Sequence, residues 1–400
     1  IMLPFLPSIS VVTIINGLLA SLEHYGASSL AQIAMNLCMI AGLGVALFFP
    51  IDLQPEVLAW SVCASAAVQY GLLAVIARKV GISALPCRPA LSPAIRKMLS
   101  LMTAAIMGST VYQITILLNT ALASLLPTGS ISWLFYADRI FQLPIGIFTV
   151  ALSSVLLPRL SENHAKRDGT AAHSQLINAL RYSLFFLSPI AVIMFAQSEM
   201  IMSVLFERGA FTHNDSIQSA NALSTYSFAL LPLSLYTMLS RHLIAKKQPI
   251  IPACIGLCSL VVGMLVAIAT MGEVSIETNQ SFHVFIRSLQ HLLPVHYSLY
   301  HVGLALSSVC AAITSLIISL VIVFIIEGVD PSKVIASAWR TGLASFISYW
   351  GYSRIAPYLS SSFPSLLTGT VTIFAFYYLV TFLLQTPELN ELRARRRHRD

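Results

Sequence analysis

The sequence has very few charged residues. Only 10% of its 400 residues are Asp, Glu, Lys or Arg, whereas 56% are hydrophobic. A soluble globular domain carries roughly a quarter charged residues, so this composition excludes one. We therefore expect a polytopic membrane protein whose apolar surface faces lipid and neighbouring helices.

The sequence also lacks the motifs of the common nucleotide-driven and hydrolytic enzymes. No Walker-type phosphate loop occurs, which disfavours ATP hydrolysis, and neither HExxH nor GxSxG is present. The 16 acidic residues do not gather into a pair suited to general acid–base work. We expect no catalytic residue, and an integral-membrane transferase is disfavoured.

Cysteine is scarce as well, with six residues in the chain, five of them inside apolar runs, where we expect them to act as small buried hydrophobes. Cys254 and Cys258 share a helix face, but no His or carboxylate stands near them in the sequence. Without the fixed spacing of metal ligands, the sequence predicts no metal site and no bound cofactor.

Long hydrophobic runs are abundant in the sequence, and each is close to the ~20 residues that a bilayer requires. No ten-residue alternating pattern of the barrel type occurs, so the prediction is an all-α fold with about eleven transmembrane helices. The runs are 2–22, 31–50, 56–77, 98–125, 131–157, 178–205, 219–244, 250–271, 299–326, 334–356 and 363–385.

The 23 Lys and Arg residues are distributed unevenly between the loops. Alternate loops and the C-terminal tail hold 19 of them, and the opposite loops hold only Arg208, Arg287 and Arg354. By the positive-inside rule the basic loops and the C-terminus face the cytoplasm. Contact with anionic lipid headgroups then explains the net charge of +7, and no nucleic-acid partner is expected.

The N-terminus of the chain is apolar from its first residue. It opens on "IMLPFLPSIS", with neither an initiator Met nor a signal peptide. With eleven spans and a cytoplasmic C-terminus, the first span begins outside. The sequence therefore predicts an N-terminally truncated transporter that lacks an odd number of preceding spans.

Two charged residues, Asp138 and Arg139, lie inside the apolar run 131–157. Arg139 sits roughly 12 Å along that helix, where an unpaired charge costs about 3 kcal/mol or more. Consecutive residues project about 100° apart, so the two cannot pair face to face. Gln142 lies one turn beyond Asp138, and Pro144 is a hinge where the span can kink.

Two interpretations of these charges remain open. In one, they pair with polar groups on neighbouring spans and only hold the bundle together. In the other, Arg139 is a cavity cation that grips an anionic substrate bidentately, and Asp138 tunes or latches that site. Polar residues of the preceding span, Gln113 and Asn119 among them, are equally suited to interhelical hydrogen bonds or to ligand contacts. The candidate substrate-binding set is Arg139, Asp138, Gln142, Asn119 and Gln113.

At these residues the chain resembles the MurJ/MviN family of bacterial lipid II flippases. The most specific match is "YADRIFQLP" (136–144), followed by "VLLPRLS" (155–161). Weaker matches in the expected order are "IMLPF" (1–5), "MNLCMI" (35–40), "LFERGAFT" (205–212), "HLIAKKQPIIPA" (242–253) and "VGLALSS" (302–308). The resemblance covers nearly all 400 residues.

The resemblance implies a fourteen-helix, two-lobe transporter of the MOP exporter superfamily that begins here at the fourth helix. The implied domains are 1–80, the rest of the N-lobe with three helices; 81–97, a cytoplasmic linker; 98–328, the six-helix C-lobe; 329–387, two C-terminal helices; and 388–400, a basic cytoplasmic tail. The last two spans would form a groove for the polyprenyl tail of the substrate.

The function implied by the resemblance is alternating-access flipping of lipid II, the lipid-linked peptidoglycan precursor, across the bacterial inner membrane. Membrane potential or an ion gradient would drive it without a cofactor, and membrane lipids and the cell-wall synthesis machinery would be its partners. Arg139 matches one of the family's essential cavity arginines. The other cavity arginines lie on helices that this sequence does not contain, and Gln142 stands where many relatives have an acidic residue.

The same residues leave two alternative functions open. One is another exporter of the superfamily, for polysaccharide-lipids or drugs, although a cation exporter should place net acidic residues in its cavity spans. The other is an inactive truncated relic that acts as a scaffold.

Overall fold

The computed structural model describes residues 2–22, 24–81, 95–96, 113–166, 169–272, 286, 288–290, 298–360 and 362–390. The predicted all-α fold is confirmed, because these residues form helices and their connections, with one isolated β-bridge between Met271 and Ser298. The chain divides into two compact units, Ile1–Arg96 and Lys97–Asp400. The division falls at the segment 81–97 that we expected to link two lobes, and the lobe assignment itself stays a prediction.

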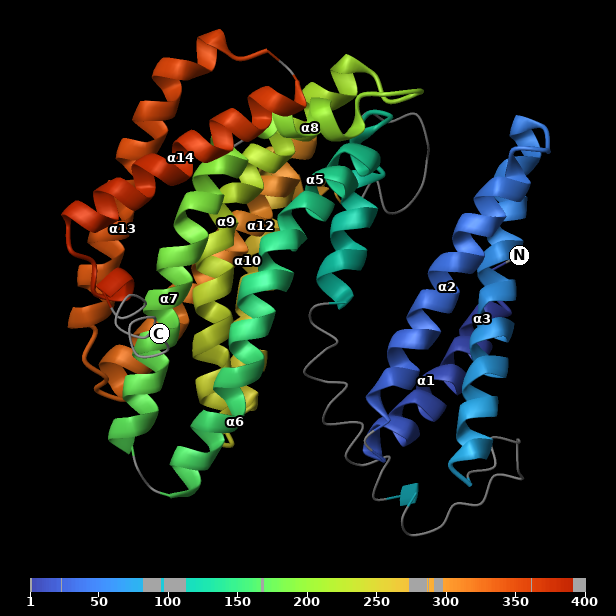
Figure 1. Cartoon of the computed structure of the whole chain (residues 1–400), viewed down its shortest axis with the longest axis horizontal. Coiled ribbons are helices and arrows are strands. Elements are labelled where there is room, and N and C mark those ends of the chain that lie inside the picture. The colour runs from blue at the N-terminus through green and yellow to red at the C-terminus, as the bar shows by residue number, and fades with distance from the viewer. Residues whose placement is uncertain are drawn as a thin grey trace, which may run out of the picture. The chain divides into compact units, whose positions relative to one another are not determined.

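The first unit is built from three helices (Figure 1). They are α1 (Phe5–Ser21), α2 (Tyr25–Ala46) and α3 (Gln54–Lys79), with a 3-10 turn, η1 (Ile51–Leu53), before α3. Leu19 and Leu73 are fully buried at their centre. The helices α2 and α3 approach so closely that a Cβ at Gly42 would overlap the Ser61 side chain. Such small residues allow the close helix contacts that hold bundles together in lipid.

The second unit is a larger helical bundle, which also contains an unlabelled helix over 113–123. Its labelled elements are α5 (Ser130–Pro144), η2 (Ile145–Val150), α6 (Ala151–Ala165), α7 (Gly169–Ala196), α8 (Ser198–Phe206), α9 (His213–Ala245), α10 (Ile250–Thr270), α12 (Tyr300–Leu320), η3 (Val321–Ile326), α13 (Ser332–Ile355), η4 (Ala356–Tyr358) and α14 (Phe363–Leu383).

The 33-residue helix α9 is the centre of this unit, and α5, α6, α7, α8 and α12 all pack on it. A capping box starts the helix: the Thr212 side chain accepts a hydrogen bond from the backbone N–H of Asp215, and the Asp215 carboxylate accepts one from the Thr212 N–H. Small buried residues such as Ser219, Ala222 and Ser234 line its faces. They let the neighbouring helices come close.

The C-terminal part of the chain is fastened to α7. In Figure 1, α13 and α14 lie together against α7, and the Tyr377 hydroxyl of α14 donates to the Phe185 carbonyl of α7 at 2.8 Å. Glu388, which follows α14, is bound to α7 as well: the Arg181 Nε donates to its carboxylate oxygen at 2.7 Å, and both side chains are buried. The expected tail of 388–400 thus begins with a residue packed inside the bundle.

Eight helical segments of the described residues are long and apolar enough to cross a membrane. They are Ser29–Ala46, Ile51–Lys79, Ser130–Asn163, Gly169–Ala196, His213–Ala245, Ile250–Thr270, Tyr300–Ile326 and Phe363–Leu383. Of the other three expected spans, α1 is shorter, α13 carries several charged and polar residues, and 98–125 is described only from residue 113. The chain is a multi-pass membrane protein, and the count of eleven spans stays a prediction.

One expected span has different bounds in the structure. The run 178–205 does not form a single helix, because α7 begins earlier and ends at Ala196, and α8 begins after it as a separate helix. Gln197 separates the two with non-helical dihedral angles and is buried against Gly369 of α14. Hydropathy hides this break, since the segments 190–196 and 200–206 are both largely apolar and the polar residues between them are few.

Candidate functional site

The helix α5 is held against α9 along one face. Trp133 Nε1 donates to the Asp215 carboxylate at 2.8 Å, and the Phe141 ring stacks on that of Tyr226 with centroids 5.4 Å apart. Ala137, between them on the helix, is fully buried. This packing fixes the rotation of α5 and so determines where its charged residues point.

Arg139 lies on the exposed side of α5, and its guanidinium carbon stands 4.5 Å from the centroid of the Phe135 ring. A cation over an aromatic face is stabilised by the ring quadrupole. Asp138 is half-buried and accepts a hydrogen bond from the Gln142 amide. As the helical spacing predicted, Asp138 and Gln142 are on the same side, and among the described residues Asp138 and Arg139 form no ion pair.

Directly after Pro144 the helix changes to a π-helical segment, η2, and then continues as α6. Within η2, Thr149 is buried and its hydroxyl donates to Ser234 of α9 at 2.9 Å. Such π-helical turns are found mostly as single insertions in α-helices, often at functional sites. A backbone irregularity is therefore present where the sequence predicted a kink, and the role of Pro144 as a hinge stays a prediction.

Gln113 and Asn119 lie on the helix over 113–123. That helix packs through Leu122 and Ala123 against α10 and α12. Gln113 is exposed and Asn119 half-buried. Among the described residues, no hydrogen bond joins either of them to the charged residues of α5, and their place in a shared site with Arg139 stays a prediction.

A cavity of about 490 Å³ lies between η2, α6 and α7. Its walls are mostly apolar, and Phe148, Leu152 and Phe186 are among them. Its polar lining includes Arg159, whose side chain is exposed, and Ser183, whose buried Oγ has no hydrogen-bond partner in the described residues. The cavity thus combines lipid-like walls with the cation of Arg159.

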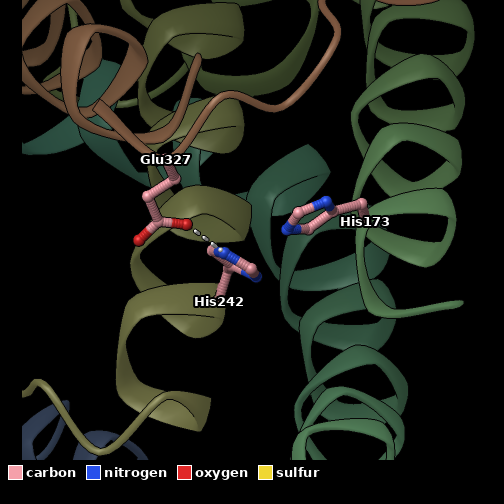
Figure 2. Close-up of side chains that lie close together, drawn as sticks. All are labelled: His173, His242 and Glu327. Atoms are coloured by element: carbon pink, nitrogen blue, oxygen red, sulfur yellow. Dashed lines mark hydrogen bonds and ion pairs between the residues drawn. The ribbon is translucent and has the colours of Figure 1, made fainter. Parts of the chain in front are cut away.

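A polar cluster that the sequence did not reveal lies where α7 begins and α9 ends. His242 Nε2 and Glu327 are hydrogen-bonded at 2.9 Å, Lys246 Nζ lies 2.8 Å from the other Glu327 oxygen, and His173 stands beside His242 (Figure 2). Partial burial alone would raise the pKa of Glu327, but the hydrogen bonds from His242 and Lys246 outweigh burial and lower its pKa to about 2. Glu327 is therefore ionised at neutral pH.

These features define the class: a multi-pass α-helical membrane protein with an exposed cation, Arg139, on a helix long and apolar enough to cross a membrane. The family description "Lipid II flippase MurJ" matches residues 1–377. The chain belongs to the MurJ family, as the resemblance predicted.

Curated relatives are similar over part of their length. The chain is 32% identical over 250 residues to a protein of Rhizobium tropici named "Probable lipid II flippase MurJ", covering 62% of this chain and 47% of that one. It is 30% identical over 271 residues to "Lipid II flippase MurJ" of Burkholderia cenocepacia, covering 66% and 52%. The chain thus spans about half the length of the curated relatives it matches.

A solved structure shares the fold. It is titled "Lipid II flippase MurJ, inward closed conformation" and matches with a TM-score of 0.73 at 20% identity. The match covers 95% of this chain and 72% of that one. At this identity the likeness supports the helical architecture and not a residue's role.

Proposed function

We propose that this chain moves lipid II, a lipid-linked peptidoglycan precursor, between the leaflets of the bacterial inner membrane, acting as a transporter and not as an enzyme. The observation that carries the proposal is Arg139, an exposed cation in a candidate membrane span of a MurJ family member, with no carboxylate in an ion pair with it among the described residues. A cation left open inside a membrane segment is costly unless it meets an anion during function.

The substrate fits this cation chemically. Lipid II carries a pyrophosphate, and a guanidinium binds phosphate oxygens through two parallel hydrogen bonds while keeping its charge when desolvated. The Asp138 carboxylate accepts a hydrogen bond from Gln142 and forms no ion pair with Arg139 among the described residues, so the donors of the guanidinium are not taken up by it. The Phe135 ring covers one face of the Arg139 guanidinium, so the N–H groups along the edge of the guanidinium stay available for oxygen ligands.

The apolar part of the substrate also needs a path. We propose that α13 and α14 hold the polyprenyl tail. Their exposed faces carry large apolar side chains, including Trp339, Phe346, Val371 and Leu383. Exposed surface of this kind is stable against lipid chains and costly against water.

We further propose that the basic loops and the C-terminus face the cytoplasm, in line with the 19 to 3 distribution of Lys and Arg. Membrane potential or an ion gradient, and no cofactor, would drive the cycle. Membrane lipids would surround the protein, and the cell-wall synthesis machinery would be its partner in the membrane.

The test is complementation. The chain, expressed in a bacterium depleted of its own lipid II flippase, should restore growth, and Arg139→Ala should abolish that growth at unchanged membrane levels. Arg208→Ala, which removes an exposed arginine from the loop before α9, is the matched control and should grow normally. Absence of growth with the unmodified chain would contradict the proposal and favour the scaffold alternative.

A further inference from the structure

Three potential metal ligands converge from separate parts of the second unit. His173 comes from the first turns of α7, His242 from the last turn of α9, and Glu327 comes directly after η3. One ligand atom from each lies within 4.8 Å of the others. Figure 2 shows His173 reaching towards His242 from one helix, while Glu327 bonds His242 from the opposite side.

We propose that His173, His242 and Glu327 form a binding site for a divalent transition metal of the zinc type. Two imidazoles and one carboxylate are a recurrent zinc ligand set that leaves a fourth position for water. The nature of the ligands also disfavours Mg²⁺ and Ca²⁺, which prefer oxygen ligands alone. The site is separate from Arg139, and the inference does not rest on the proposed transport.

The geometry requires only small movements. Tetrahedral zinc, with bonds of about 2.0–2.1 Å, holds its ligand atoms roughly 3.4 Å apart. The His242 Nε2 to Glu327 Oε2 distance of 2.9 Å would widen slightly, and His173 would move in from at most 4.8 Å. His173 is only half-buried at a helix start, so side-chain rotation can supply that movement.

The charges around the cluster define the roles of its members. Lys246 Nζ lies 2.8 Å from Glu327 Oε1, leaving the other oxygen, Oε2, on the side of His242. Lys246 thereby orients the carboxylate, as outer hydrogen-bonding groups do in metal sites. Its ammonium also repels a cation, but it is 28% exposed and can turn towards solvent. Lys246 is thus a positioning residue and not a ligand.

A bound metal would connect the start of α7, the end of α9 and the segment after η3. These three parts of the second unit would then move together. Since anything that binds only the folded state stabilises it by mass action, metal binding should raise the unfolding temperature.

The experiment uses the full 400-residue chain, purified with chelator and reconstituted in lipid nanodiscs. Zn²⁺ should raise the unfolding temperature in a saturable way, and Co²⁺ should produce the visible absorption of a tetrahedral site. His173→Gln should weaken Zn²⁺ binding by at least about 100-fold, because even the loss of an outer-shell partner costs 10–100-fold. Glu327→Gln should do the same.

Two control variants separate this site from other effects. His213→Ala removes an exposed His whose ring lies 3.2 Å from Glu207, a pair without a third ligand among the described residues, and should bind Zn²⁺ as the unmodified chain does. Lys246→Met should keep the Co²⁺ spectrum with altered affinity. If Zn²⁺ stabilises His173→Gln as much as the unmodified chain, or if the unmodified chain shows no saturable effect, the site does not exist.

Discussion

The Asp138 carboxylate and the Arg139 guanidinium belong to consecutive residues of α5, yet each has a different partner. Asp138 accepts from Gln142 one turn further on, and Arg139 lies over the Phe135 ring one turn back. The Asp138 side chain therefore interacts towards the C-terminus of α5, and the Arg139 side chain towards its N-terminus. This separation leaves the guanidinium able to bind an anion.

We expect transport to require the paired donors of the Arg139 guanidinium as well as its positive charge. Arg139→Lys retains the positive charge but loses the paired donors that match a phosphate. In the complementation assay we expect Arg139→Lys to grow poorly and Arg139→Ala not at all. In proteoliposomes, the lysine variant should flip lipid II at least about 10-fold more slowly, since a charged hydrogen bond is worth about 1.5–3 kcal/mol. Equal rates for the lysine variant and the unmodified chain would show that charge alone suffices.

The buried ion pair between Arg181 and Glu388 should control stability. Replacing one partner leaves the other charge buried and uncompensated, which costs about 3–5 kcal/mol. Glu388→Leu and Arg181→Met should each lower the unfolding temperature in nanodiscs. The double variant should be less destabilised than the sum of the two, because neither charge then remains. Strictly additive losses would mean that the pair is not coupled.

Pro144 should act on the rate of the conformational cycle and not on substrate binding. In Pro144→Ala a backbone N–H is restored that can donate to the Ile140 carbonyl, which stiffens the α-helical turn directly before η2. We expect slower flipping with unchanged lipid II affinity, measured by transport and by direct binding. Pro158→Ala, in the interior of α6, is the matched control for replacing a helical proline. A loss of affinity in Pro144→Ala without a loss of rate would contradict the hinge role.

The orientation can be tested at two exposed lysines. Single cysteines at Lys166 and Lys247 should react with a membrane-impermeant maleimide only from the cytoplasmic side. The background must lack native cysteines, because Cys254 and Cys258 are free and exposed. Labelling of either position from the outside would reverse the topology.

Much of the architecture could be predicted because hydropathy and charge act locally. The apolar runs predicted helices, and the spacing of Asp138, Gln142 and Pro144 predicted a shared helix side and an irregular backbone. The break at Gln197 could not be predicted, since it depends on contact with Gly369 of a distant helix.

The clusters formed by tertiary packing were equally hidden. By sequence alone Arg181 is one more basic residue, near the start of the apolar run 178–205, and its partner Glu388 lies 207 positions away. His242 and Glu327 are 85 positions apart and belong to no recognisable motif. Such contacts arise only when the helices pack, so no spacing rule in the sequence predicts them.

The π-helical segment η2 changes the rotational phase between α5, which precedes it, and α6, which follows it. Each extra residue per turn rotates the downstream helix by about 100° relative to a continuous α-helix. Residues 130–144 and 151–165 are therefore two helical patterns out of phase, although they belong to one continuous helical segment. A helical wheel that treats them as a single amphipathic pattern would therefore misplace Arg159 by about 100° for each inserted residue. Deleting one residue within 145–150 would rotate the α6 residues that line the cavity relative to Arg139, while the residues of α5 and of α6 stay the same.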